Sequence, residues 1–340
     1  MIDEYVEEKL NKPAEDNIGK HKASGQKFEK KNKLRLYICE IKCIYEEERQ
    51  RKIRSDMWAK GDGFYTVEEL RKRLSISTFV FWEYRPIGQS TLEELARHGI
   101  RKIELLESPE QFDMADASSM RFIREVCRSC GIEVVAYHAH KTNFSDLDTE
   151  AKRTARVDFC RRQIDTMLDL GGVLWGSHAH AADGTLVKCY EDLARHVDGT
   201  PAVIAVENFT GKGMWVEDRM AFLREIDHPQ VGMILDIGHV RNHDGANPMT
   251  IPGGPTQVLE MCGSRLRHVH LHGFKDGVDH FPPFVEGDNI QWVELFRMFR
   301  TIGYSGYMNF EPRGEPHHHN VLQATAFAPQ RIVEMEAQTR

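Results

Sequence analysis

An alternation of short apolar runs with amphipathic stretches, from about residue 77 onward, constrains the fold of this chain most. Strands that alternate with helices pair in parallel through right-handed crossovers. Three of the helix-like stretches finish on Gly99, Gly171 and Gly303, and glycine is common just past a helix end. Eight runs rich in Val, Ile and Phe predict strands, at residues 77–82, 101–107, 131–140, 171–180, 201–209, 230–239, 265–274 and 306–312.

Eight such units match the size and strand number of an α/β (β/α)8 TIM barrel, which we predict over residues 77–340, with a C-terminal helix. A doubly wound open sheet is the alternative. That fold usually carries a Gly-rich phosphate loop after an early strand, and no G-x-G-x-x-G occurs in this chain. The barrel is therefore the favoured architecture.

Residues 1–76 stand apart from this repeat and predict an N-terminal extension that is partly flexible and partly helical. The polar segment KHKASGQKFEKKNK favours flexibility, and Thr66 with Glu69 forms the pattern of a capping box that opens a helix through Leu74. We expect the extension to cover the barrel's N-terminal face or to mediate a homo- or hetero-oligomeric contact. A lid or partner-binding arm is the alternative.

The composition excludes several classes of function. The net charge is −7, and no basic stripe interleaved with aromatic residues occurs, so we expect no nucleic-acid partner. No apolar run approaches the ~18–20 residues that a membrane span needs, and the acidic start MIDEYVEEKL does not resemble a signal peptide. A cytoplasmic protein with no membrane association is expected.

Polar side chains concentrate where the predicted strands end, which is where barrel enzymes place their chemistry. Carboxylates that share one small volume cannot all ionise without a cation to offset their repulsion. A single divalent metal ion is the simplest such cation, and mixed oxygen and nitrogen ligation without Cys favours Mn2+, with Mg2+, Co2+, Fe2+ or Zn2+ possible. The strand-end residues are His138, His140, His178, Glu207, Asp236, His239, His270, His272 and Glu311.

The seventh strand, within HVHLHGFKDGVDH, carries alternate histidines at 268, 270 and 272. Alternate residues of a strand share a face, so all three point into the barrel. Only those near the carboxyl end reach the pocket, and His268 is therefore predicted to lie deeper and to be structural. The trailing DGVDH is predicted to be a loop over the pocket, with His280 as its contact.

These motifs resemble the xylose isomerase-like barrel superfamily of sugar isomerases, epimerases and related lyases. The matching elements are VEN, LDIGH, HVHLHG with DHFPPFVEGDNI, and NFEP, and the resemblance covers about three quarters of the chain. It implies that the metal ligands are Glu207, Asp236, His270 and Glu311. It also implies that His239 helps to hold the substrate, and we place His138, His272 and His280 beside it.

The activity that this resemblance implies is proton abstraction next to a carbonyl, with Glu207 and Glu311 moving the proton in a sugar isomerase or epimerase. Related ketose 3-epimerases usually carry Arg six residues after the ligand His; Asp276 stands there in this chain and argues against 3-epimerisation of a free ketose. A lyase is the first alternative, either a keto-inositol dehydratase or a C-deglycosidase subunit that acts on 3-oxo-glucosides. His140 or His178 would then serve as acid or base.

Two further alternatives remain open. The paired histidines of the third and fourth strands resemble those of the trinuclear-zinc AP endonuclease branch, and His280 matches a further ligand of that branch. A barrel subunit without catalysis is the other alternative, but such a chain should have lost one or more ligand positions, and all four are filled here.

Overall fold

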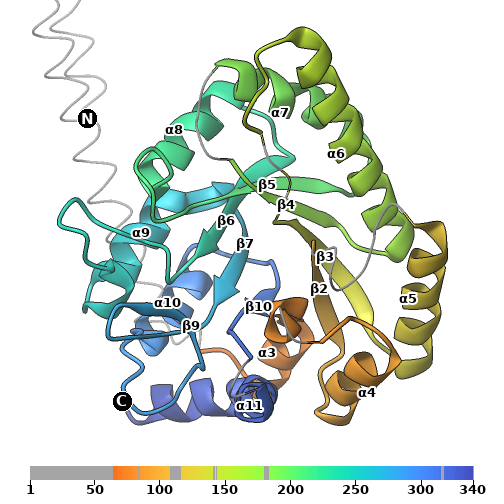
Figure 1. The fold of residues 1–340 in the computed structure, drawn as a ribbon. Helices are drawn as coiled ribbons and strands as arrows, with labels where there is room; N and C mark the ends of the chain where they lie inside the picture. The colour runs from red at the N-terminus through yellow and green to blue at the C-terminus, as the bar shows by residue number, and fades with distance from the viewer. Residues whose placement is uncertain are drawn as a thin grey trace, which may run out of the picture. The chain divides into compact units, whose positions relative to one another are not determined.

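The computed structural model describes residues 64–82, 85–107, 116–140, 142, 144–179, 184–314 and 318–339 (Figure 1). The chain divides into two compact units, and the second extends from Phe64 to Arg340. The expected extension, over its residues 1–63, lies outside the described part. Helix α3 (Val67–Arg73) begins at the predicted capping box: Thr66 Oγ1 accepts from the Glu69 backbone, and Glu69 accepts from the Thr66 backbone N–H at 2.7 Å.

Eight parallel strands close into a barrel in the order β1-β10-β7-β6-β5-β4-β3-β2, so the predicted TIM barrel is confirmed. Each strand pairs with the next through a helical crossover, as parallel connections require. The barrel strands are β1 (Leu74–Ser77), β2 (Lys102–Leu106), β3 (Glu133–Ala139), β4 (Leu174–His178), β5 (Val203–Glu207), β6 (Val231–Asp236), β7 (Leu266–Leu271) and β10 (Met308–Phe310).

Helices lie around the outside of the strands and bury one apolar face each (Figure 1). Gly99, Gly171 and Gly303 follow their helices with φ of +81°, +95° and +68°, the left-handed conformation predicted for these glycines. The helices are α4 (Gln89–Arg97), α5 (Ala117–Cys130), α6 (Glu150–Leu170), α7 (Gly184–Val197), α8 (Val216–Ile226), α9 (Gly254–Cys262), α10 (Trp292–Thr301) and α11 (His318–Ala337). No helix of the described part is long and apolar enough to cross a membrane.

The first strand differs from its prediction. Residues 77–82 were expected to form it, but β1 ends at Ser77, and Thr78–Phe81 form a 3-10 helix. The Ser77 hydroxyl accepts a hydrogen bond from the Phe79 backbone N–H at 3.3 Å, and this local cap competes with extension of the strand. The apolar run is buried under the barrel mouth instead of inside the sheet.

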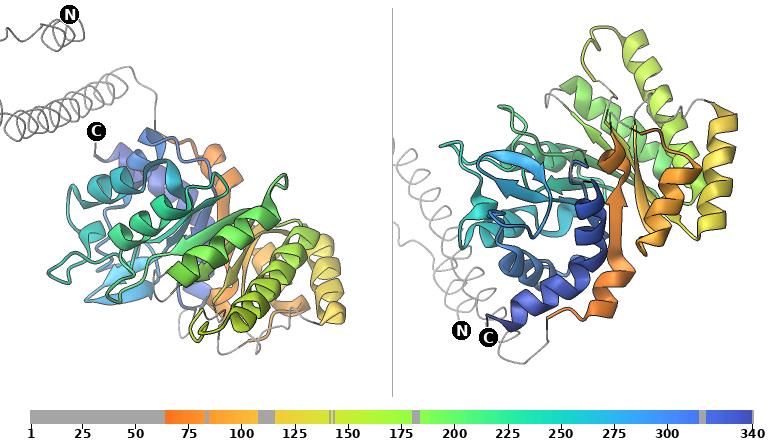
Figure 2. Two further views of the ribbon diagram at one scale, coloured as in Figure 1. Left: turned by 90° about the horizontal axis from the view of Figure 1, so that it is seen from above. Right: turned by 60° about the horizontal axis from the view of Figure 1, so that its bottom comes forward.

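The first and last helices of the barrel unit contact each other, and a hairpin follows β7. Helix α11 packs against α3, so the last and first helices of this unit are neighbours (Figure 2). Beyond β7, the expected loop is a two-stranded antiparallel hairpin of β8 (Gly273–Lys275) and β9 (Val278–Phe281). Its turn residues Asp276 and Gly277 both have positive φ, +52° and +83°, as a two-residue hairpin turn requires.

The barrel interior changes character along its axis. Near the amino ends of the strands, Ala136, Leu174, Ala205 and Ile234 belong to one apolar cluster. Gly176 leaves room for it, because a Cβ at that position would lie 2.3 Å from Ile234 Cδ1. Glu104 and His268 are buried in register with Ala136 and Ile234, so the floor below the candidate site is apolar on the side of β3 to β6 and polar on the side of β2 and β7.

Candidate active site

Four side chains from four neighbouring strands converge at the carboxyl end of the barrel. Glu207 ends β5, Asp236 ends β6, His270 lies in β7, and Glu311 directly follows β10. One donor atom from each lies within 4.8 Å of the others, and the four residues are buried. The structure therefore brings together the set for which the sequence predicts metal ligation.

Two atoms of this cluster lack a well-aligned hydrogen bond. His270 Nδ1 lies 3.4 Å from Glu207 Oε1 and 3.1 Å from Glu311 Oε2, yet neither His270 Nδ1 nor Glu207 Oε1 has a hydrogen-bond partner. Buried polar atoms without partners are rare in folded proteins, because burial without compensation is costly. A divalent cation among these donors would satisfy both atoms, so the residues present fit a metal ion.

Burial and neighbouring charges shift the pKa values of the cluster in opposite directions. Burial raises the pKa of Glu207 and of Glu311, but His270 and neighbouring imidazoles bring both pKa values well below the ordinary range. Burial likewise lowers the pKa of His270, while Glu311 and Glu104 help to raise it well above its ordinary value. The carboxylates thus need positive charge nearby, which either a proton or a metal ion can supply.

Backbone and side-chain donors fix the Asp236 carboxylate. Its Oδ1 accepts hydrogen bonds from the backbone N–H groups of Gly238 and His239 at 2.9 and 2.8 Å. His272 Nε2 lies 3.0 and 3.1 Å from the two oxygens. Oδ2 faces His270 Nδ1 at 3.9 Å, so the carboxylate turns one oxygen toward the cluster.

His272 lies behind Asp236 and outside the residues that line the cavity. Its Nδ1 accepts the backbone N–H of His280 at 2.8 Å, and a backbone N–H can only donate. Nδ1 also lies 3.1 Å from the Gly273 carbonyl, but its shorter contact is with the backbone donor, which favours the tautomer whose Nε2 carries the proton toward Asp236. This location differs from the expected place beside the substrate and suits the orientation of Asp236.

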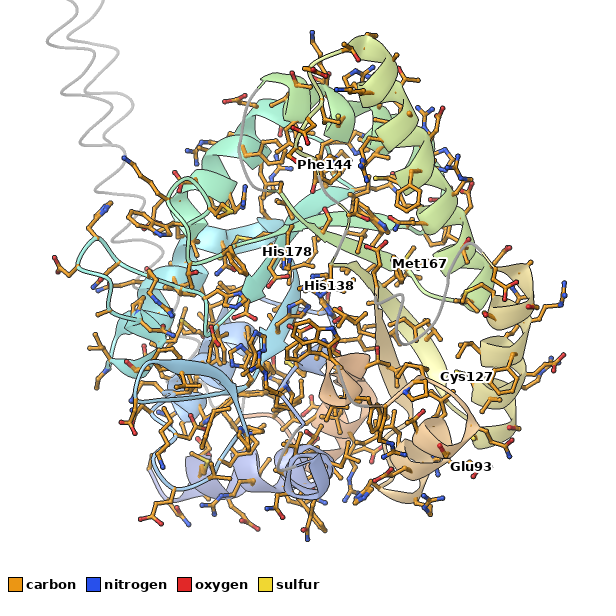
Figure 3. The ribbon with its side chains drawn as sticks, in the orientation of Figure 1. Glu93, Cys127, His138, Phe144, Met167 and His178 are labelled. Atoms are coloured by element: carbon orange, nitrogen blue, oxygen red, sulfur yellow. The ribbon has the colours of Figure 1, made fainter. Side chains whose placement is uncertain are left out.

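A cavity of about 220 Å3 opens above the cluster. Figure 3 shows two of its residues, His138 and His178, near each other at the centre of the barrel. Aromatic side chains form part of the wall beside the imidazoles and carboxylates. The lining residues are Phe79, Trp82, Leu106, His138, His140, His178, Glu207, Phe209, His239, Asp279, His280, Glu311 and Arg313.

His138 lies between the two glutamates of the cluster. Its Nε2 is 3.1 Å from Glu207 Oε2, and its Nδ1 is 3.3 Å from Glu311 Oε1. His178 Nε2 approaches the same Glu207 oxygen at 3.0 Å. His140 completes a group of three imidazoles, and burial together with His138 lowers its pKa to about 3, so it is neutral at pH 7.

A second imidazole group lies on the other side of the cavity. His239 Nε2 is 3.3 Å from His280 Nε2 and 3.5 Å from Asp279 Oδ2. His280 has φ of +50°, which is uncommon for a residue with a side chain and is concentrated at functional sites. Its Nδ1 donates to the Glu311 carbonyl at 2.7 Å, which leaves Nε2 of the neutral ring as an acceptor facing the cavity.

A larger hollow of about 710 Å3 lies near Leu74 and Lys102, at the opposite, amino ends of β1 and β2. It contains none of the clustered donors and is bordered by basic side chains such as Arg71 and Arg97. The proposed catalysis needs the clustered carboxylates and imidazoles, and members of this cluster line only the smaller of the two cavities, so the smaller cavity is the candidate active site.

Two residues that support the site from behind are not predicted from the sequence. Glu104 of β2 is fully buried, and its carboxylate contacts His268 and His270 at 2.9 and 3.3 Å. A lone Glu inside the apolar run KIELL was the available signal. Arg219 of α8 is buried and donates to the Glu207 carbonyl at 2.8 Å and to the Ala179 carbonyl; an arginine on an amphipathic helix gives no such signal.

Comparisons with known proteins agree with the fold. The family described as "Xylose isomerase-like TIM barrel" matches residues 92–330. A 3-dehydroshikimate dehydratase of Pseudomonas putida is 24% identical over 229 residues, which are 62% of this chain and 31% of that protein.

Two solved structures share the architecture at low identity. A D-tagatose 3-epimerase-like protein superposes with a TM-score of 0.61 and 19% identity, covering 78% of this chain and 99% of its own. A xylose isomerase-like TIM barrel protein from Mycobacterium smegmatis, solved in complex with magnesium, gives a TM-score of 0.62 and 15% identity, covering 81% of this chain and 99% of its own.

Proposed function

Because the chain belongs to the xylose isomerase-like TIM barrel family, we propose that it is a divalent-metal-dependent isomerase or epimerase of a small sugar or sugar-derived carbonyl compound. The observation that carries the proposal is the convergence of Glu207, Asp236, His270 and Glu311 below a small cavity. Drug-sized pockets measure roughly 300–1,000 Å3, so a cavity of about 220 Å3 suits a smaller, monosaccharide-sized ligand.

The metal would be held by the same four residues, with Mn2+ as the first expectation and Mg2+ supported by the magnesium-bound neighbour. When bound, it would polarise the substrate carbonyl and stabilise the negative charge that develops as the adjacent proton leaves.

The chain's own residues would then handle the proton. The carboxylates of Glu207 and Glu311 are on either side of the His138 ring and within hydrogen-bond reach of its two nitrogens. A proton taken by one carboxylate can therefore be returned from the other, and His138 can pass it between them. Return of the proton to the opposite face gives the epimer, and return to the neighbouring carbon gives the isomer.

A lyase is the alternative outcome of the same proton abstraction, and the dehydratase relative supports it. If a group β to the carbonyl departs, it needs a proton from the cavity wall. His178 is placed for this, since its ring contacts Glu207 at 3.0 Å, whereas the lowered pKa of His140 leaves that ring without a proton to donate at pH 7. A keto-inositol or a 3-oxo-glucoside would be the corresponding substrate.

The test is deuterium incorporation by the metal-loaded protein on a panel of keto-sugars. The proposal expects C–H exchange with formation of an isomer or epimer, and the Glu311→Gln variant should lose both. Glu94→Gln, which changes a buried carboxylate paired with Arg85 at a distance from the site, is the matched control. If the substrate loses water or an aglycone and no isomer forms, the result would contradict the isomerase proposal and support the lyase.

A multinuclear hydrolase of the endonuclease branch is the second candidate function, and one observation favours it. Besides the central four, three more donor groups of the described residues meet the geometry of a metal site. Two lie to either side of the centre, namely His138 with His140 and His178, and Asp236 with His239 and His280, and the third joins Glu104 to His138, His270 and Glu311. Metal analysis after loading with Zn2+ separates the candidates. Three ions per chain would favour the hydrolase, and one ion would favour the isomerase.

A further inference from the structure

A second buried carboxylate lies on the opposite side of His270 from the cluster. His270 presents Nδ1 to Glu207 and Glu311, while its Nε2 lies 3.3 Å from Glu104. We propose that Glu104 is a positioning residue: it accepts the Nε2–H of His270 and thereby holds Nδ1 as the atom that binds the metal. This inference rests on the proposed metal site and concerns how that site is supported.

The hydrogen bonds of Glu104 differ from those of Glu207. Its Oε1 accepts from Asn309 Nδ2 at 3.1 Å, and its Oε2 accepts from His268 Nε2 at 2.9 Å as well as from His270. Glu207 Oε1, by contrast, has no hydrogen-bond partner. Both oxygens of Glu104 thus already accept side-chain donors, on the opposite side of the His270 ring from Glu207, and this arrangement suits support of the ring. The alternative, in which Glu104 binds a metal together with His138, His270 and Glu311, is an outcome of the test below.

Neighbouring strands hold Glu104 in turn. Asn309 is paired with His270 across β10 and β7 and with Ser75 across β1 and β10, so these three residues form one row around the barrel. Ser75 Oγ donates to Asn309 Oδ1 at 2.8 Å, which aims the Asn309 amide N–H group at Glu104. The chain from Ser75 through Asn309 to Glu104 is fully buried and fixes the carboxylate against rotation.

This arrangement has a defined effect on a metal ligand. An imidazole that binds a metal through one nitrogen is oriented and made more basic when its other N–H donates to a carboxylate. In this barrel, the carboxylate comes from β2, across the interior from β7. Glu104 should therefore raise the affinity of the site for a metal while it touches neither the metal nor the substrate.

Titration of the purified, metal-free full-length protein with Mn2+ in a calorimeter tests the proposal. Glu104→Gln keeps the side chain's size and removes its charge, and we expect Mn2+ to bind about 10–100-fold more weakly. Glu104→Asp keeps the charge but moves the carboxylate away from His270 by the length of one methylene group. It should also weaken Mn2+ binding, because the proposal depends on the contact between the carboxylate and His270. Glu94→Gln should bind Mn2+ like the wild type. Unchanged affinity in both Glu104 variants would overturn the proposal.

Two further measurements separate the alternatives. The absorption spectrum of the Co2+-loaded protein should keep the wild-type coordination number in Glu104→Gln, and loss of a ligand would identify Glu104 as a ligand and overturn the proposal. If neither Glu104 variant folds, Asn309→Ser frees the carboxylate without removing it and should weaken Mn2+ binding about tenfold; wild-type affinity there would overturn it. A wild-type protein that binds no Mn2+ would instead overturn the proposed function itself.

Discussion

Two buried polar clusters lie one above the other in this barrel, and they differ in how their polar atoms are satisfied. In the upper cluster, around Glu207 and His270, the atoms Glu207 Oε1 and His270 Nδ1 face each other at 3.4 Å, and neither has a hydrogen-bond partner. In the lower cluster, Glu104 is bonded to His268, His270 and Asn309. Both contain carboxylates and imidazoles at similar burial, so residue type alone does not separate a candidate site from its support.

The number of buried polar atoms without a hydrogen-bond partner therefore distinguishes the candidate site from the residues that support it. A satisfied buried network makes the structure specific and rigid, whereas an unsatisfied one is kept only where a ligand completes it. Substitutions in the upper cluster should therefore cost mainly function, whereas those in the lower cluster should cost stability and, at Glu104, metal affinity as well. The predictions below test this division, beginning with the largest expected effect.

Glu207→Gln should reduce turnover by about 10³-fold, since general acid–base groups contribute roughly 10²–10⁴-fold. The change removes one carboxylate that faces four imidazoles and the cavity. Initial rates on the keto-sugar panel measure it, with the fold checked by circular dichroism. Activity within a few-fold of wild type in a metal-loaded variant would contradict a catalytic role for the upper cluster.

His268→Leu should lower the free energy of unfolding by about 3 kcal/mol, because it leaves the buried Glu104 without its shortest hydrogen bond. Urea unfolding in the presence of a chelator measures this value. Under the same conditions, Glu311→Gln should cost less, because it removes a charge from a crowded group of carboxylates. The reverse order of the two variants would break the division between the clusters.

Gly238→Ala should weaken Mn2+ binding about tenfold through the ring that orients Asp236. A Cβ at Gly238 would lie 2.0 Å from His272 Cε1, so the ring must move away from the carboxylate. Calorimetric titration measures the affinity. Gly184→Ala, where a Cβ meets nothing within 4 Å, is the matched control and should bind as the wild type does.

The smallest effect is expected at a carboxylate that is satisfied but exposed. The Thr66 backbone N–H and Arg300 lower the pKa of Glu69 to about 2 from 4.5. The stabilisation is therefore complete above pH 4.5 and is lost as the pH falls toward 2. Glu69→Gln should cost about 0.5 kcal/mol at pH 7, given its exposure. Unfolding curves of the two proteins should converge near pH 2, and a constant difference would contradict the assignment.

Much of this architecture follows from sequence periodicity. Seven of the eight predicted runs contain the corresponding barrel strand, because buried parallel strands are short, apolar and separated by amphipathic helices. The first failed because local capping by Ser77 outweighs the strand propensity of Phe79 and Val80. The sequence analysis predicts a loop at Asp276-Gly277, where the structure has a hairpin, although the Asp-Gly pair is a strong hairpin signal.

The candidate site was less accessible to prediction. The convergence of Glu207, Asp236, His270 and Glu311 follows from their places at strand ends once the barrel closes. Glu104 could not be placed this way, because it lies inside a strand and reaches its partners across the barrel. His180, the second histidine at the end of the predicted fourth strand, lies outside the described part of the chain, so its place stays a prediction.

The central claim is that the unsatisfied upper cluster is a metal site, and metal binding tests it most directly. Mn2+ titration of the metal-free protein should give one ion per chain for the isomerase, with binding strongly reduced in Glu311→Gln and retained in Glu94→Gln. Absence of stoichiometric binding in the wild-type protein, or equal binding in Glu311→Gln, would contradict the account.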